Sequence, residues 1–333
     1  MKPCSTGVCS FLFEDAGRPG TDMKRYLLKR IGLLLFLLWA VSTLVFFLIH
    51  LIPGDPVESI IGEGARIEDV RRLRHELGLD RPLLEQYWEY NRELLTLGLG
   101  ESIYNNRRVS ENILEYLPNT LLLAFFAAAI SIGISLPLGS WAAFREGSWI
   151  DSLATFFSSA GLAVPNFFLG PLLIILFSIR LKWLPVSGSE SFAHVILPAV
   201  TLGTAMCAAL TRIVRTSVGM EMNKPYVLFA RARGLGEFRI FCRHVLKNAL
   251  IPIVTTIGLQ FGALLTGAII TETIFSWQGI GVLLIKSINR RDYPMVQGVI
   301  VFITFTYLIV NFLVDVSYFF LDPRIKNEIG SGA

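Results

Sequence analysis

The chain has 333 residues, of which 53% are hydrophobic and only 17% are charged, whereas soluble domains carry about 25% charged residues. The charges cluster between apolar runs that are long enough to cross a bilayer, which excludes an ordinary soluble protein and indicates an all-α integral membrane protein. The net charge of +4 gives no indication of nucleic acid as a partner, because basic residues in membrane proteins more often report orientation.

Residues 1–22 differ from the rest, since they contain no apolar stretch long enough for a signal peptide. Met23 begins the segment "MKRYLLKR", which is typical of a start before a membrane helix. We therefore expect residues 1–22 to be a disordered extension or the product of an upstream start, in which Cys4 and Cys9 carry no function. Residues 23–333 are expected to form one transmembrane domain.

The first predicted membrane helix runs from Ile31 to Ile52. Four basic residues precede it: Lys24, Arg25, Lys29 and Arg30. Residues 53–117 then form a long polar loop, in which Val70, Leu73 and Leu77 recur at helical spacing before Gly78. A second amphipathic piece follows Pro82 and contains Tyr87, Trp88 and Tyr90, which suit a membrane interface. We expect this loop to be a helical cap on the outer membrane surface.

Five further spans are expected, at residues 118–144, 152–179, 194–211, 249–271 and 296–321. Six crossings place both termini in the cytoplasm. The basic excess at 212–248 supports this orientation, because lysine and arginine accumulate in cytoplasmic loops. Arg290 and Arg291 fall outside in this arrangement, but the basic residues on the other side outnumber them.

The segment "PYVLFARARGLG" in the basic loop predicts a short helix from Pro225 to Arg233, ended by Gly234. Tyr226, Phe229, Ala230 and Arg233 share one face of it. An apolar helix face suits docking into a groove on a partner protein. Attraction to anionic lipid head groups is the alternative, and it would explain only the charge.

A second helix is expected from Glu237 to Asn248, with Pro252 marking the return into lipid. It carries Cys242 and His244, the one pair of cysteine and histidine at close spacing. At positions i and i+2 these side chains point in different directions, so we expect scattered structural cysteines rather than a metal site.

The basic loop resembles the cytoplasmic EAA loop of permease subunits of bacterial ABC importers, and in particular the di/oligopeptide and nickel branch. Gly234, His244 and Leu246 match the spacing of that motif, while Leu228 and Lys247 depart from it in ways that look typical of the branch. Further segments are similar to the same family: "LIPGDP", "LRHELGLDRPLLEQY", "LPNTLLLA", "VPNFFLG", "ILPAVTLG", "ETIFSWQGIG", "RDYPMVQG" and "LDPRI". Gln278 stands where the family would have proline.

The resemblance implies a permease in the cytoplasmic membrane of a bacterium or archaeon. It would pair with a second, homologous permease and work with two cytoplasmic ATPases and an external solute-binding protein. The short helix would be the coupling helix, and the expected ATPase contacts are Tyr226, Phe229, Ala230, Arg231, Arg233, Gly234, Leu235 and His244. Because the sequence has no GxxxxGK[ST] phosphate loop, we expect no enzymatic activity and no cofactor in this chain, with ATP bound by the partners.

Four residues of the predicted fifth span and its end lie near one stripe: Gln260, Gly267, Thr271 and Glu272. We hypothesise that this stripe faces the substrate path and that Glu272 sits at its outer gate. Close helix packing by small residues is the alternative.

Two other classes of protein fit less well. An ion-coupled transporter would show two pseudo-symmetric halves with broken helices, and a membrane hydrolase would show a GxSxG or HExxH pattern. The sequence contains neither signal. Among substrates, di- and oligopeptides are favoured by the resemblance, and nickel or other metal chelates and glycosyl conjugates stay open.

Overall fold

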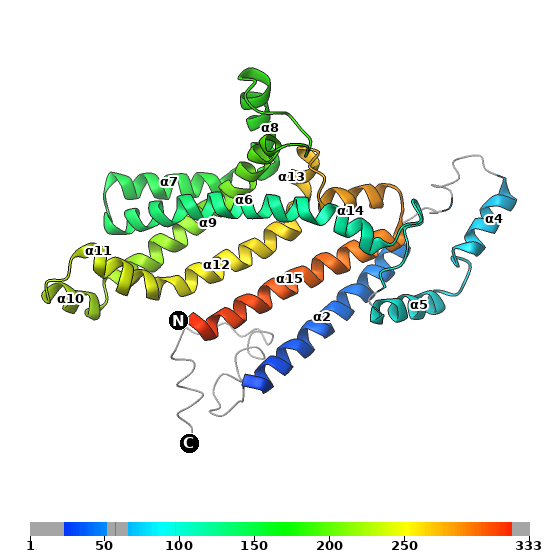
Figure 1. Cartoon of the computed structure of the whole chain (residues 1–333), viewed down its shortest axis with the longest axis horizontal. Coiled ribbons are helices and arrows are strands. Elements are labelled where there is room, and N and C mark those ends of the chain that lie inside the picture. The colour runs from blue at the N-terminus through cyan, green and yellow to red at the C-terminus, as the bar shows by residue number, and fades with distance from the viewer. Residues whose placement is uncertain (1–22, 52–56, 58–65, 97, 322–333) are drawn as a thin grey trace.

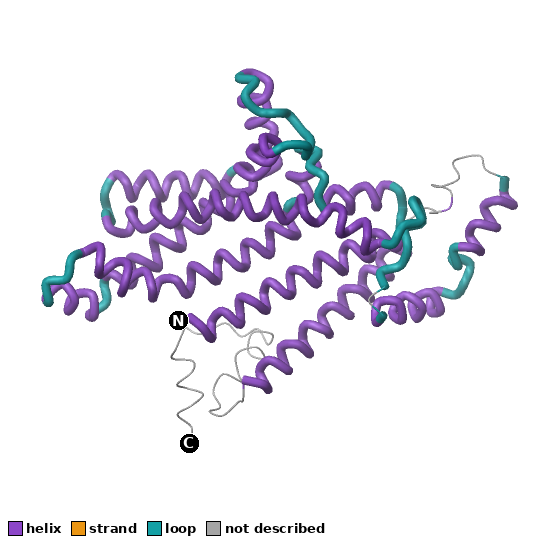
Figure 2. The backbone as a smooth tube through the Cα atoms, viewed as in Figure 1, coloured by secondary structure: helices purple, strands orange, loops and turns teal. Residues whose placement is uncertain are grey.

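The computed structural model describes residues 23–321 apart from 52–56, 58–65 and 97, so the predicted extension 1–22 lies outside it. The described part is helical, with one isolated bridge between Glu101 and Arg108, and the all-α prediction is confirmed. Its five long helices lie side by side (Figures 1 and 2): α2 (Met23–Leu51), α6 (Val109–Phe144), α9 (Phe192–Met222), α12 (Leu246–Gly267) and α15 (Tyr293–Leu321).

Within the described residues, five helices are long and apolar enough to cross a membrane. The predicted third span, 152–179, is divided into two helices: α7 (Trp149–Ala163) and α8 (Asn166–Leu173), which a π-helical stretch extends to Arg180. The two parts meet at 100°, and counting them as one span gives six. The bend falls at Val164, which is extended because the following Pro165 disfavours helical backbone there.

Two helices extend beyond the spans predicted from hydropathy. α6 begins at Val109 rather than at Pro118, and α9 ends at Met222 rather than at Thr211. The extra turns of α9 stay helical because they are packed: Val214 is fully buried against the chain itself. Hydropathy detects the turns that suit lipid, whereas a helix continues for as long as its backbone and packing allow.

The fifth span differs from the prediction at both ends. α12 starts at Leu246 and is continuous, through a π-helical stretch, with α11 (Glu237–Ile240). Pro252 therefore lies inside a helix and does not mark its boundary, as membrane helices tolerate proline where neighbours satisfy the freed backbone groups. At the other end, α12 stops at Gly267, before the predicted Thr271.

The core lies along α6 and α9, the two helices that pack against each other most extensively. Leu123 of α6 and Leu202 of α9 are buried there together with Trp277. A second cluster joins α2, α6 and α15 around Val299 at one end of the bundle, and a third joins α9 and α12 around Ile253 at the other. The short helices that contain the predicted site residues are attached to these two end clusters.

The loop after α2 contains the two predicted helices: α4 (Ile67–Glu76) and α5 (Leu83–Leu95). Gly78 follows α4 with φ of +66°, as a residue ending a helix does. Tyr87 and Tyr90 pack on Phe46 of α2, with ring centroids 5.3 and 5.5 Å from it, whereas Trp88 is 75% exposed. The cap is thus held by α2, and its position on the outer membrane surface stays a prediction.

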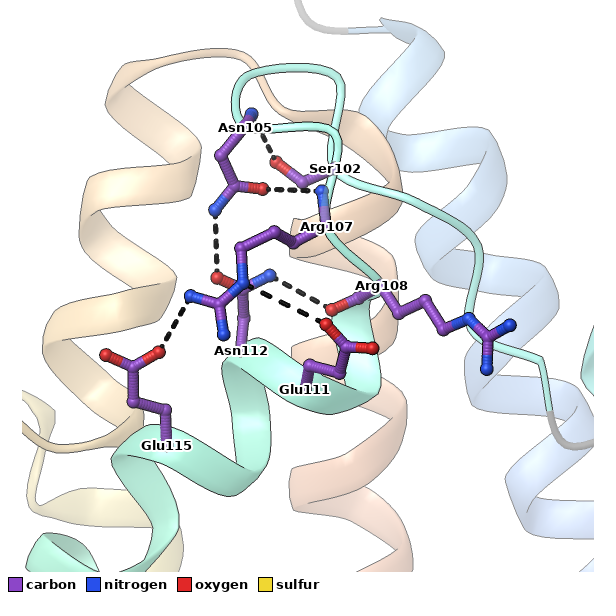
Figure 3. A network of polar contacts seen from close by, with 7 residues as sticks. All are labelled: Ser102, Asn105, Arg107, Arg108, Glu111, Asn112 and Glu115. Carbon is purple, nitrogen blue, oxygen red and sulfur yellow. Dashed lines mark hydrogen bonds and ion pairs between the residues drawn. The ribbon is translucent and has the colours of Figure 1, made fainter.

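The start of α6 is held by the polar network of Figure 3. Arg107 lies between Glu111 and Glu115, which it contacts at 3.9 and 3.0 Å. The Asn105 side chain donates to Asn112 at 2.9 Å, so the loop before α6 is tied to its first turns. These contacts fix the entry of α6 into the bundle.

Candidate functional site

Helix α10 (Pro225–Ala232) forms at the end of the bundle away from α5 (Figure 1). Lys224 is extended and precedes Pro225, which occupies the first helical position, where its missing N–H costs no hydrogen bond. The helix ends at Ala232 with Arg233 as its cap residue, one position before the predicted end. Local sequence signals therefore define this helix well.

Gly234 closes α10 in the left-handed conformation, with φ of +76°. Its N–H donates to the Arg231 carbonyl at 2.9 Å, and the N–H of Leu235 donates to the Ala230 carbonyl at 3.3 Å. This pair of bonds is the Schellman motif, which satisfies carbonyls that the last turn of a helix leaves without partners. The chain then turns sharply into α11.

We expect Gly234→Ala to lower the free energy of unfolding by about 1 kcal/mol, because a Cβ disfavours the left-handed backbone. No atom lies within 4 Å of the added carbon, so the effect is one of backbone conformation alone. Gly219→Ala is the matched control, since Gly219 lies within α9, has no left-handed backbone and has equally open surroundings. Thermal unfolding of the purified chain in detergent measures both, and equal melting temperatures for the two variants would contradict the expectation.

One side of α10 faces its own chain. Val227 and Ala230 are buried in the end cluster formed with α9 and α12. The half-buried Tyr226 hydroxyl donates to Glu221 at 2.5 Å and accepts from the Asn248 amide at 3.1 Å. Burial, together with the bond to Glu221, raises the pKa of Tyr226 above its usual range. α10 is thereby fixed to both long helices.

The other side of α10 is apolar and uncovered. Leu228 is 69% exposed and Phe229 is 63% exposed, and Phe238 of α11 adds a third large side chain with 82% exposure. Large exposed apolar side chains grouped on two connected helices mark interaction surfaces more often than ordinary solvated surface. We call Leu228, Phe229 and Phe238 the α10–α11 apolar patch.

Basic residues border the apolar patch. The Arg233 guanidinium lies 5.3 Å from the centroid of the Phe229 ring, within the range of a cation–π contact. Arg231 makes two bonds to the Glu237 carboxylate, at 2.8 and 3.1 Å, which link α10 to α11 across the glycine turn. The patch is thus presented on a pair of connected helices.

The predicted ATPase contacts divide between the two sides of α10. Exposed are Phe229, Arg231, Arg233 and Gly234; turned toward the chain are Tyr226, Ala230, Leu235 and, half-buried in the π-helical stretch, His244. The residues predicted to share one face of α10 therefore lie on two sides of it. The outward side also includes Leu228 and, on α11, Phe238, which were not among the predicted contacts. The sequence places apolar residues on both sides of this short helix, so spacing alone could not choose between them. A missed signal was the pair of adjacent apolar residues, Leu228 and Phe229.

A second polar cluster lies at the other end of the bundle. Two short helices form it: α13 (Ile269–Ile274) and α14 (Ile280–Asn289). Glu272 is fully buried, and its carboxyl group accepts from the N–H groups of Gly281 at 2.8 Å and Val282 at 3.3 Å. Thr120 of α6 donates to Glu272 at 2.8 Å and accepts from the Ile280 N–H at 2.8 Å. Two side chains thus satisfy the first three N–H groups of α14, which have no partner within the helix.

The neighbouring backbone leaves room for the Glu272 carboxyl group. A Cβ on Gly279 would lie 2.2 Å from the Glu272 Oε1, and one on Gly281 would lie 2.6 Å from the Cα of Ile269. Side chains at these positions are therefore incompatible with the observed approach of α13 to α14.

The predicted stripe of pathway residues does not lie on one helix. Gln260 and Gly267 belong to α12, whereas Thr271 and Glu272 belong to α13, after the turn at Ala268. Thr271 is buried, and the Gln260 Oε1 is buried without a hydrogen-bond partner among the described residues. Their role in a substrate path stays a prediction, and the structure gives Glu272 contacts within its own chain.

The chain is similar in sequence to known permease proteins over most of its length. It is 38% identical over 304 residues to the glutathione transport system permease protein GsiC of Escherichia coli O6:H1, covering 91% of this chain and 99% of that protein. GsiC of Salmonella typhimurium gives the same values. A solved structure described as inward-facing conformations of the MetNI methionine ABC transporter aligns with a TM-score of 0.52 at 16% identity, covering 63% of this chain and 96% of that chain, which shows the fold alone.

Two family descriptions match the chain. Residues 135–327 match the binding-protein-dependent transport system inner membrane component, and residues 23–124 match the N-terminal part of such a membrane component. The family consists of membrane subunits rather than enzymes, and its importers include ATPase and binding-protein partners. The chain belongs to this family of multi-pass inner-membrane permease subunits of bacterial ABC importers.

Proposed function

We propose that this chain forms part of the substrate path of an ATP-driven importer of di- and oligopeptides, paired with a second homologous permease. The names of its relatives support a peptide-like substrate, because glutathione is a short peptide. The alternative is import of nickel or metal chelates by the same transporter class, because the sequence motifs resemble those of the di/oligopeptide and nickel branch. An external binding protein would deliver the substrate.

The α10–α11 apolar patch is the observation that carries the coupling role. We assign α10 to a cleft on one of two cytoplasmic ATPases, which bind the ATP. Val227 and Ala230 join α10 to the cluster around Ile253, so a displacement of α10 acts directly on α9 and α12. Closure of the ATPases would then shift the permease between inward- and outward-facing states, because ATP binding and substrate binding bias the same element. Both chain termini lie on the ATPase side in this orientation.

Uptake into proteoliposomes tests this function. The chain is reconstituted with its permease, ATPase and binding-protein partners, and uptake of labelled glutathione, a dipeptide, a pentapeptide and a nickel–histidine complex is followed with ATP inside the vesicles. We expect ATP-dependent uptake of at least one peptide and none of the nickel complex. ATP-independent uptake by the chain alone would contradict the importer mechanism, and uptake of the nickel complex alone would select the alternative substrate.

A further inference from the structure

A cavity of about 370 Å³ lies between α2, α12 and α15, and its lining contains no residue of the α10–α11 apolar patch and neither Glu272 nor Thr120. Its lining is mostly apolar, with a small polar group at one end. The lining residues are Arg30, Leu33, Leu34, Leu37, Thr255, Leu259, Tyr307, Leu308, Asn311, Val314 and Asp315. The volume falls within the range of small-molecule sites.

The cavity is built from one regular face of each helix. On α2 the lining positions follow the spacing i, i+3, i+4 and i+7 from Arg30, and on α15 they include Leu308, Asn311 and Asp315 at i, i+3 and i+7. Leu33 and Leu259 are 40% and 45% exposed, so the apolar wall is open to the surroundings of the helices. In a membrane protein those surroundings are lipid or another subunit.

The charged lining residues lie at one end of the cavity along the membrane direction. Arg30 lies close to the start of the apolar span Leu28–Leu51, and Asp315 lies close to the end of the span Tyr293–Ser317. Leu37 and Leu308 lie about two turns deeper into their helices, or roughly 10 Å. Charged groups at the end of an apolar span stand at head-group level, so the cavity is polar there and apolar toward the middle of the bilayer.

The polar end has unused hydrogen-bonding groups. Arg30 forms an ion pair with Asp315 through one terminal nitrogen. The Arg30 Nε–H and the Asn311 Oδ1 are both buried and have no hydrogen-bond partner among the described residues. Buried polar atoms are nearly always paired in native structures, so one donor and one acceptor in the same cavity point to a bound group that supplies both.

We propose that this cavity binds a phospholipid with a phosphoethanolamine head group. The lipid phosphate accepts from the Arg30 Nε–H, and the ammonium group donates to Asn311 Oδ1 and to the Asp315 carboxylate. The upper part of one acyl chain lies on Leu34, Leu37 and Leu259. A phosphocholine head group has the same charges but no N–H donor, and a phosphoglycerol head group offers Asp315 no cation, so both fit less well.

The test uses the complete importer, purified in detergent after incubation with equal amounts of phosphatidylethanolamine, phosphatidylcholine and phosphatidylglycerol. Retained lipid is quantified by mass spectrometry. Asn311→Leu removes the acceptor, and Leu34→Trp fills the apolar part while leaving the charges in place. Thr304→Val is the control on α15, because the Thr304 hydroxyl donates to the Ile300 carbonyl of its own helix and Thr304 does not line the cavity.

We expect phosphatidylethanolamine to be retained in preference to the other two lipids. Its retention should fall about tenfold in both cavity variants and stay unchanged in Thr304→Val. Should Asn311→Leu fail to fold, Leu34→Trp still decides the outcome. Equal retention of the three lipids, or an unchanged lipid content in Leu34→Trp, would overturn the proposal. So would a cross-link from cysteine substituted at Leu34 to the second permease, which would show that a subunit covers the cavity.

Discussion

Replacing Glu272 by alanine is expected to lower the free energy of unfolding by about 3–5 kcal/mol, the largest loss among the substitutions considered. The change leaves the buried N–H groups of Gly281 and Val282 and the Thr120 hydroxyl without their acceptor. It also opens a space beside Gly279, which carries no side chain that could fill it. Thermal unfolding in detergent, followed by size-exclusion chromatography, measures the loss.

Glu272→Gln is the matched variant. One amide oxygen can still accept from the N–H groups of α14, and the amide nitrogen can donate to Thr120, so we expect it to recover most of the stability. Gln also removes the charge that the gate hypothesis needs. Normal assembly and unchanged uptake in Glu272→Gln would therefore leave the carboxyl group with a structural role only, whereas normal stability of Glu272→Ala would contradict that structural role.

Phe229→Asp is expected to abolish association with the ATPases and to reduce uptake by at least about 100-fold. A charged group in the centre of an apolar contact costs several kcal/mol, because it must be desolvated without a partner. Phe229 is 63% exposed and its ring lies beside the Arg233 guanidinium, so the permease itself should keep its stability. Copurification of the ATPases with the tagged permease gives the first readout.

Leu95→Asp controls for the general effect of charge on an exposed apolar position. Leu95 is 86% exposed on α5, at the far end of the bundle from α10. We expect it to retain the ATPases fully. If Phe229→Asp retained them as well, α10 would not be the docking helix.

Local signals in the sequence were sufficient for α10. A proline at its first position, a glycine in the left-handed conformation after its end and basic residues between them identify its bounds to within one residue. Which side of α10 faces outward could not be obtained in this way. That choice depends on how Val227 packs against α9 and α12, which are adjacent only in three dimensions.

Long-range contacts also explain the other differences. In the sequence, Glu272 is a polar residue near the end of a predicted span. Its neighbours in the sequence gave no indication that Glu272 and the distant Thr120 together accept from the first N–H groups of α14. Hydropathy gave the spans but not their ends, since α12 stops at Gly267 and α9 continues to Met222. Pro165 in the sequence could have indicated the bend between α7 and α8. Prolines inside membrane helices, however, more often kink a helix than interrupt it.

The most direct test of the coupling role is a cross-link from α10 to an ATPase in the assembled importer. Cysteine is substituted at Leu228 in a chain whose own cysteines, including the exposed Cys242, are replaced by serine. A bifunctional maleimide of short reach is then added in the presence of the ATPases, which carry a single cysteine along the docking cleft. We expect a product with the combined mass of permease and ATPase, absent when cysteine is placed at Leu95 instead. A transporting importer that gives no such product from Leu228, or gives it equally from Leu95, would contradict the docking of α10.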